Sequence, residues 1–327
     1  MAKYSNIQDI PLSLGVWLLH DTYDHQDDEN YISATSLIRP VRQSILESRL
    51  TDTRKVDLAD LISVSLGRSI HDAVERAWMD NPQAALEALG YPKKQANRIL
   101  VNPTKESIKA LADQGIDEHL PVFIEQRHIK NVGKWRVGGK FDMVIDGIVN
   151  DLKFTSTYTY MNNSRLDDYV LQLSLYRWLC PHIITEDFGY INFIFSNWEA
   201  HQAKANPNYP QSRIIIKEIQ LMSLAEVETW VRRRLQSLDT NWDLPEAALP
   251  ECTDKELWRS ETVYKYYRDP TKTDGRSTKN FSSLREAQVH KGNCKNGGVI
   301  ITVPGSPKRC GYCSVASICT QKNRYFP

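Results

Sequence analysis

The sequence contains no long run of apolar residues. Its longest runs, such as LGVWLL around Trp17, are far shorter than the roughly 18 residues that a membrane-spanning helix needs. The first residues, MAKYSNIQDI, have neither the basic segment nor the apolar segment of a secretory signal. We therefore expect a soluble protein that is neither secreted nor inserted in a membrane, and its 327 residues, 41% of them hydrophobic, are enough to bury a sizeable core.

The chain as a whole also lacks a charge bias. It has 41 Lys and Arg against 40 Asp and Glu, whereas many nucleic-acid-binding proteins are strongly basic. The balance changes near the C-terminus, where residues 252–327 hold 14 Lys and Arg but only 6 Asp and Glu. This local excess either attracts phosphate groups or forms an ordinary solvated surface.

Cysteine is absent from the first half of the chain, and no cysteine precedes Cys180. The closest spacing is Cys310-x2-Cys313-x5-Cys319. In a chain without a recognisable secretory signal, such spacing is more typical of metal or cluster ligands than of disulfides. We expect a reducing, cytoplasmic environment.

The pattern of residues predicts three regions. Residues 1–57 form an N-terminal segment of helix and loop, residues 58–250 form the core with a polar helical insertion at 80–120, and residues 251–327 form a small basic cysteine module. Apolar residues at helical spacing predict helices over about 56–79 and 167–179. A capping box of Ser223 and Glu226 begins another long amphipathic helix.

Strand patterns carry the acidic residues. The segments 122–129, 134–145 and 148–154 read as three successive strands, and Asp146-Gly147 predicts a tight hairpin between the last two. Residues two apart in a strand point to the same face, so Asp151 and Lys153 emerge side by side. With helices before and after these strands, the expected fold is an α/β sandwich around a mixed sheet.

Asp142, Asp151 and Lys153 suit phosphodiester hydrolysis. Hard divalent cations such as Mg²⁺ or Mn²⁺ bind carboxylates, and they neutralise phosphate oxygens and activate water. A lysine provides a compact positive charge for the attacking water or the phosphorus centre. A lone Asp-x-Lys usually faces solvent, so the prediction depends on the whole set, which includes the Gly-rich approach to Asp142 and a polar pair, Gln172 and Tyr176, four residues apart on the next helix.

In this order, the motifs GRSIH, GGKFD, DLK and QLSLY resemble the RecB-type branch of the PD-(D/E)XK nucleases. The resemblance covers roughly residues 58–200 and implies a restriction-endonuclease-like core, a mixed sheet flanked by helices. It also implies a metal site whose ligands are His71, Asp142, Asp151 and the backbone carbonyl of Leu152. Lys153 would be the catalytic lysine, and Gln172 and Tyr176 would position that lysine or the DNA strand.

Glu125 is open to two interpretations. It is either an additional acid near the metal or a salt-bridge partner of Arg127 or Lys140 at the rim.

The cysteine triplet resembles the C-terminal triplet that holds a [4Fe–4S] cluster in the CRISPR-adaptation and AddB-type nucleases. In those relatives the fourth cysteine lies before the histidine motif, where this sequence offers Val41. A fourth ligand must come from elsewhere, so we expect the set Cys252, Cys310, Cys313 and Cys319, with Cys294 as the second choice for the fourth position. Structural Zn²⁺ is the alternative cofactor, because four thiolates also bind zinc.

The sequence thus predicts a Mg²⁺- or Mn²⁺-dependent deoxyribonuclease. The expected substrate is single-stranded DNA or duplex ends, the expected mode is exonucleolytic, and the expected setting is recombination, repair or phage DNA metabolism, with recombination or replication proteins as candidate partners. Two alternatives stay open: a DNA-binding subunit or adaptor that does not cleave, and a restriction-type endonuclease.

Overall fold

The computed structural model describes residues 4–21, 26, 28, 30–50, 56–116, 118–163, 165–295 and 297–325. By their internal contacts, residues 1–38 and 51–236 form one unit, and residues 39–50 and 237–327 form a second. Helix α3 (Val41–Ser48) therefore belongs to the second unit, whereas the boundaries expected from the sequence group it with residues 1–57.

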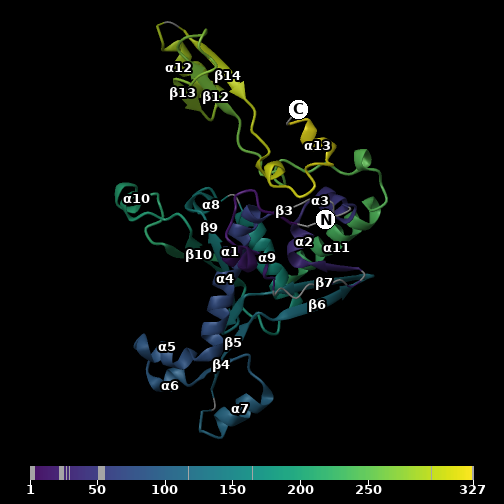
Figure 1. Ribbon diagram of the computed structural model, residues 1–327, viewed down its shortest axis with the longest axis vertical. Helices are drawn as coiled ribbons and strands as arrows, with labels where there is room; N and C mark the ends of the chain where they lie inside the picture. Colours follow the sequence, from purple (N-terminus) through teal and green to yellow (C-terminus); the bar gives the residue numbers. More distant parts are fainter. Residues whose placement is uncertain are drawn as a thin grey trace. The chain divides into compact units, whose positions relative to one another are not determined.

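The first unit contains a six-stranded mixed sheet with the order β11-β10-β9-β8-β5-β4. Figure 1 labels four of these strands, β4, β5, β9 and β10. The β9–β10 and β4–β5 pairs are parallel, and the other neighbours are antiparallel. The strands are β4 (Ile99–Val101), β5 (Leu120–Ile124), β8 (Met143–Ile145), β9 (Ile148–Thr155), β10 (Phe188–Phe195) and β11 (Ile214–Gln220). Asp146 and Gly147 join β8 to β9 with φ of +49° and +79°, which confirms the predicted tight hairpin.

A second, three-stranded sheet has the order β2-β7-β6, with β2 at Tyr31–Ser33, β6 at Arg127–Val132 and β7 at Trp135–Lys140. The prediction of single strands over 122–129 and 134–145 is therefore wrong, because each segment breaks and continues in the other sheet. Pairing persists through the break, since the Phe141 N–H donates to the Gln126 carbonyl at 3.3 Å. An alternating sequence does not reveal such a bend, since both halves keep the period of two.

The two helices that matter for the site are α4 (Leu58–Asp80) and α9 (Leu166–Leu179), close to the predicted spans. Helix α9 packs on the sheet face to which Asp151 and Lys153 point, where Leu173 is fully buried. Helix α4 lines the opposite face beside Asn150 and Leu152. The mixed α/β architecture with helices on the sheets agrees with the predicted α/β class.

Smaller elements complete the first unit. They are β1 (Tyr4–Ser5), α1 (Leu12–Leu19), α2 (Ala34–Ile38), β3 (Val56–Asp57), α5 (Pro82–Ala88), α6 (Lys93–Ala96), α7 (Lys105–Ala112), α8 (Thr157–Met161) and α10 (Ala200–Ala205). Helix α11 (Leu224–Asn241) starts at the predicted capping box, in which the Glu226 carboxylate accepts from the Ser223 N–H at 2.9 Å.

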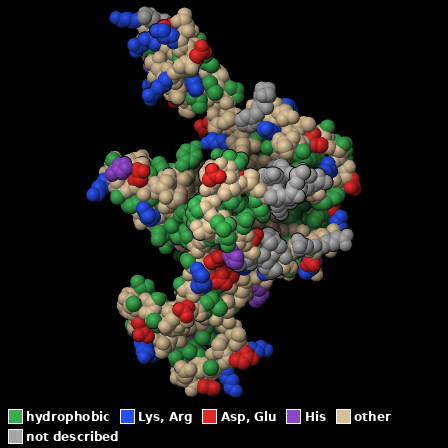
Figure 2. All heavy atoms as spheres, in the orientation of Figure 1, with side chains coloured by type: hydrophobic (Ala, Val, Ile, Leu, Met, Phe, Trp, Pro, Cys, Tyr) green, Lys and Arg blue, Asp and Glu red, His purple; other side chains and the backbone are tan. Residues whose placement is uncertain are grey.

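The second unit contains an antiparallel sheet of order β13-β12-β14, with β12 at Val263–Tyr267, β13 at Lys279–Phe281 and β14 at Val299–Val303. Helix α12 (Leu284–Gly292) packs on it, and Lys and Arg side chains gather over this part of the chain (Figure 2). The remaining elements are η1 (Glu246–Ala248), η2 (Lys308–Gly311) and α13 (Thr320–Asn323). Among the described residues, no helix combines the length and the apolar character that crossing a bilayer requires.

Candidate functional site

Two carboxylates lie where the paired strands change sheets. Glu125 directly follows β5, Asp142 directly precedes β8, and the Glu125 N–H donates to the Asp142 carbonyl at 3.0 Å. Glu125 has a φ of +52°, a conformation that residues other than glycine seldom adopt and that is found preferentially at functional sites. The bend in the chain therefore brings two acidic side chains to one place.

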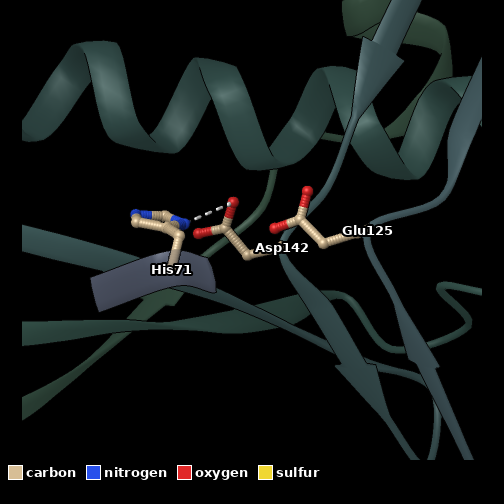
Figure 3. Close-up of side chains that lie close together, drawn as sticks. All are labelled: His71, Glu125 and Asp142. Atoms are coloured by element: carbon tan, nitrogen blue, oxygen red, sulfur yellow. Dashed lines mark ion pairs between the residues drawn. The ribbon is translucent and has the colours of Figure 1, made fainter. Parts of the chain in front are cut away.

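Helix α4 adds His71 to these carboxylates. His71 Nδ1 lies 3.5 Å from Asp142 Oδ1, and one ligand atom each from His71, Glu125 and Asp142 lies within 4.8 Å of the others. Figure 3 shows the three side chains pointing toward one another. An imidazole with two carboxylates is a donor set suited to a divalent cation.

His71 and Asp142 stabilise each other's charged forms. Burial lowers the pKa of His71, but its hydrogen bond to Asp142 and the charge of that carboxylate outweigh burial, so the pKa is raised overall. Burial raises the pKa of Asp142, but His71, Lys153 and the Leu152 N–H outweigh it, so this pKa is lowered. The Leu152 N–H donates to Asp142 Oδ2 at 2.7 Å, which fixes the carboxylate beside β9.

Asp151 is the most deeply buried acid of the site, with only 1% of the residue exposed. Lys153 Nζ lies 2.7 Å from Asp151 Oδ2, so the two side chains form a buried ion pair. Burial raises the pKa of Asp151 to about 6, and Asp142 adds to the increase while Lys153 opposes it. Asp151 does not belong to the three residues whose ligand atoms lie within 4.8 Å of one another, so the structure brings His71 and Asp142 together with Glu125 rather than with Asp151.

Helix α9 holds the lysine through a chain of polar contacts. Lys153 Nζ donates to Gln172 Oε1 at 3.2 Å, and Gln172 Nε2 donates to the Tyr176 hydroxyl at 2.9 Å. The ammonium also lies 5.4 Å from the ring centre of Tyr169, which sequence reasoning missed. Burial lowers the pKa of Lys153, but Asp151 and the other contacts raise it overall, so the lysine stays protonated at neutral pH.

Glu125 fits both of its interpretations. Its carboxylate lies 2.6 Å from Lys140 Nζ, and it also belongs to the group with His71 and Asp142. Burial raises the pKa of Glu125, and the charges of Asp142 and Glu75 raise it further, although Lys140 lowers it. A cation between Glu125 and Asp142 would relieve this repulsion.

In the second unit, Cys252, Cys310, Cys313 and Cys319 line one cavity. Burial raises the pKa of the Cys252 thiol to about 12, and the charges of Glu256, Cys319 and Cys313 contribute. Burial and the neighbouring cysteines also raise the pKa of Cys310. Four thiolates gathered here would repel one another, so the set suits a metal or cluster that neutralises them.

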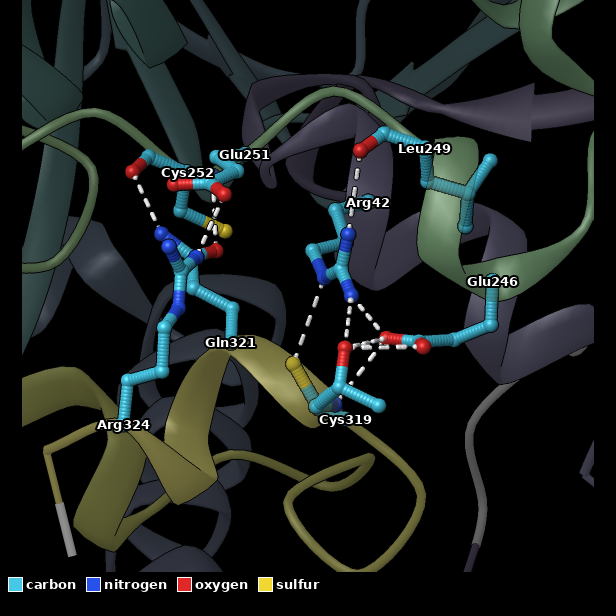
Figure 4. A network of polar contacts seen from close by, with 9 residues as sticks. Arg42, Glu246, Leu249, Glu251, Cys252, Cys319, Gln321 and Arg324 are labelled. Carbon is cyan, nitrogen blue, oxygen red and sulfur yellow. Dashed lines mark hydrogen bonds and ion pairs between the residues drawn. The ribbon is translucent and has the colours of Figure 1, made fainter.

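A buried arginine, Arg42, lines this cavity, and Figure 4 shows its contacts. Arg42, 3% exposed, donates from Nε to Cys319 Sγ at 3.3 Å and from Nη1 to the Leu249 carbonyl at 3.1 Å. Its Nη2 pairs with Glu246 and donates to Thr320 Oγ1 at 3.2 Å. Sequence reasoning missed Arg42, although it follows Val41, the position of the absent cysteine.

The other two cysteines lie elsewhere. Cys294 Sγ is 3.7 Å from His290 Nε2 at the end of α12, and it does not line the cavity of the four cysteines. Cys180 is fully buried, its thiol donates to the Tyr176 carbonyl at 3.1 Å, and burial raises its pKa to about 12.

Comparison with known proteins gives only distant likenesses. No family model and no curated protein matches the chain. A crystal structure described as that of SSO0001 is 17% identical, with a TM-score of 0.38 over 69% of this chain and 89% of that one. A phage-related exonuclease from Haemophilus somnus 129PT is 16% identical, with a TM-score of 0.26 over 53% of this chain and 80% of that one. Both TM-scores are low, so the chemistry of the site has to be argued from its own geometry.

Proposed function

We propose that this protein is a divalent-metal-dependent nuclease that hydrolyses phosphodiester bonds in DNA. The observation that carries the proposal is the group of His71, Glu125 and Asp142, whose ligand atoms lie within 4.8 Å of one another. The buried ion pair of Asp151 and Lys153 is close enough for its charges to act on Asp142. His71, Asp142, Asp151 and the Leu152 carbonyl are the proposed ligands, with Glu125 as a further candidate.

Mg²⁺ or Mn²⁺ fits this set, because carboxylate and carbonyl oxygens are the ligands of hard divalent cations. When bound, such an ion neutralises phosphate oxygens and lowers the pKa of a coordinated water. The Leu152 N–H holds Asp142 in place, and the hydrogen bond between His71 and Asp142 orients both side chains.

The protonated Lys153 stabilises the negative charge that builds up on the phosphate during hydrolysis. It can do so because Gln172 accepts from its ammonium and is itself held by Tyr176. We propose that Gln172 and Tyr176 are positioning residues, since they reach the reacting atoms through the lysine.

More specifically, we propose that the protein is a RecB-type PD-(D/E)XK nuclease that acts as an exonuclease on single strands or duplex ends. We propose that it works in the cytoplasm, in DNA recombination, repair or phage DNA metabolism. The order of His71, Asp142, Asp151, Lys153 and Gln172 along the chain supports this assignment.

The test uses purified protein, Mn²⁺, and DNA labelled at either end in linear and circular form. We expect nucleotides or short products from linear DNA, and loss of cleavage in Asp151→Asn and Lys153→Met. Asp146→Asn is the matched control, because Asp146 is exposed in the hairpin turn of the same strand pair. Calorimetric titration with Mn²⁺ should show binding to the wild type and the control but weaker binding to Asp151→Asn.

Two other outcomes would change the assignment. Binding of DNA without cleavage under any divalent cation would point to a DNA-binding adaptor, and equal cleavage by Asp151→Asn would overturn the proposed site. Discrete fragments from circular DNA would indicate a restriction-type endonuclease.

For the second unit we propose a [4Fe–4S] cluster on Cys252, Cys310, Cys313 and Cys319. The four cysteines line one cavity, and the spacing Cys310-x2-Cys313-x5-Cys319 supports a cluster over zinc. Four thiolates would hold such a cluster.

Anaerobically purified protein should be brown and contain iron and sulfide, and Cys252→Ser should lose them while Cys294→Ser keeps them. A colourless protein with one zinc would favour the alternative.

A further inference from the structure

A cavity of about 310 Å³ opens directly beside His71, Glu125 and Asp142, which are called the metal group below. Helix α4 forms one wall, and the face of the six-stranded sheet opposite Asp151 and Lys153 forms the other. His71, Glu125 and Asp142 line one part of it, so the cavity and the metal group share residues. Its volume is at the lower end of the range of small-ligand pockets, which is on the order of 300–1,000 Å³.

Most of the cavity wall is apolar. Trp78 contributes from α4, and Ile214 and Ile216 contribute from the edge strand β11. The two isoleucines are 56% and 64% exposed, whereas the residues on the other face of the strand are half-buried or buried. Exposed isoleucines that line a cavity are typical of a binding site.

Two asparagines give this wall a polar centre. Asn150 on β9 and Asn192 on β10 face the cavity, and Asn192 Nδ2 donates to Asn150 Oδ1 at 3.3 Å. Asn150 Nδ2 in turn donates to the Ile148 carbonyl at 3.0 Å, so its orientation is set within the sheet. Asn192 keeps a carbonyl oxygen and a second N–H that can serve a ligand with both donors and acceptors along one edge.

A nucleobase has that combination, a flat apolar face with a polar edge. We propose that this cavity takes one or two unpaired bases of the strand whose phosphate lies at the metal group. This inference rests on the proposed nuclease function and narrows its substrate from single strands or duplex ends to DNA that is single-stranded at the site of cleavage. A paired and stacked base presents neither its face nor its full edge, so it has to leave the duplex to enter such a pocket.

The position of the metal group indicates which ligand the cavity would bind. It would hold a phosphate of the strand, and the bases next to that phosphate lie within reach of a cavity that shares its residues. Trp78 offers a stacking surface that is tolerant of sequence, and the apolar wall accepts any of the four bases.

The experiment combines a change in the DNA with a change in the cavity. Cleavage efficiency, kcat/KM with Mn²⁺, is measured for a single-stranded oligonucleotide, for the same oligonucleotide with abasic sites at the terminal positions, and for a blunt duplex. The variants are Trp78→Ala and Ile216→Ala, and the second is expected to fold because Ile216 is 64% exposed. Trp242→Ala and Ile7→Ala are the matched controls, since Trp242 is 40% and Ile7 80% exposed and neither lines the cavity.

Loss of one stacked base weakens binding about 5- to 150-fold. We expect a loss of this size for the abasic oligonucleotide and for the blunt duplex with the wild-type protein. Trp78→Ala should show a similar loss on the intact oligonucleotide and little further loss on the abasic one, because the base and the indole act on each other. Ile216→Ala should show the same pattern to a smaller degree, and the controls should behave like the wild type.

Equal cleavage of intact and abasic DNA would overturn the inference, as would a Trp78→Ala or Ile216→Ala loss of the same size on both substrates. Absence of cleavage on every DNA would instead overturn the proposed nuclease function. Binding of 2-aminopurine oligonucleotides to Lys153→Met provides a readout that does not depend on turnover. The fluorescence of a base next to the end should fall on binding, and unchanged fluorescence in a bound complex would also count against the pocket.

Discussion

Replacing Arg42 by methionine tests how the second unit holds its cysteines. Arg42 is 3% exposed, and its guanidinium contacts Cys319, Leu249, Glu246 and Thr320. Methionine keeps much of the length and apolar volume of the side chain but provides no donor. The change therefore removes the charge and the hydrogen bonds while filling most of the space.

The expected cost follows from what the change leaves behind. Breaking a buried ion pair costs about 3–5 kcal/mol, because the remaining charge stays buried without its partner. The Glu246 side chain is 23% exposed and also accepts from the Thr320 N–H at 3.0 Å, so part of its solvation is preserved. We therefore expect a loss near the lower limit, about 3 kcal/mol in the free energy of unfolding of this unit.

The assay has to report on the second unit separately, since the chain forms two units. Hydrogen–deuterium exchange in peptides that cover α3 and residues 246–252, measured in increasing urea, gives the local free energy of opening. Arg39→Met is the matched control on the same segment. Its ion pair with Glu47 at 2.7 Å is 41% exposed on the arginine side, so it should cost at most about 1 kcal/mol.

A double variant separates the ion pair from packing. Arg42→Met with Glu246→Gln removes both charges and should recover part of the loss. If Arg42→Met costs no more than Arg39→Met, or if the double variant is as unstable as the sum of its parts, the argument from a buried charge is wrong.

Three further predictions concern other contacts. Burial raises the pKa of Glu47, but hydrogen bonds from Ser314 and Gln43 and the charge of Arg39 lower it overall. Ionised Glu47 therefore stabilises the fold above pH 4.5, and this stabilisation is lost as the pH falls. Glu47→Gln should make the free energy of unfolding decline less steeply in acid. Gly139→Ala should cost about 1–3 kcal/mol in thermal or urea unfolding, because its Cβ would lie 2.7 Å from Leu179 Cδ1, whereas Gly67→Ala, with no atom within 4 Å, should not destabilise. Cys180, fully buried with a pKa of about 12, should resist iodoacetamide at pH 8 until urea unfolds the protein; rapid labelling of the folded protein would contradict its placement.

Local patterns predicted the helices and the hairpin of the site. Apolar residues at helical spacing predicted α4 and α9, although Val64 of α4 is 60% exposed and α9 is buried on more than one face. Asp146-Gly147 suits a turn that requires two positive φ angles. The period of two in β9 likewise places Asp151 and Lys153 on one face, and the two side chains form an ion pair. These features depend on neighbours within a few residues, which the sequence displays directly.

Other features of the site depend on distant parts of the chain. The bend at Glu125 and Asp142 could not be read from the alternation of residues, because the period continues through it, and it is this bend that gathers the two acids beside His71. The contact between Arg42 and Cys319 joins residues 277 positions apart.

By itself, the sequence determined the order and type of the main elements and the chemistry of their polar residues, because these follow from local propensity, periodicity and residue type. Only the tertiary structure decided that Asp151 is buried in an ion pair with Lys153, that Cys252 and not Cys294 shares the cavity of the triplet, and that an apolar pocket adjoins the acids. The physical reason is that desolvation and the sharing of a cavity arise from packing between segments far apart in the chain, and packing of that kind leaves no local pattern.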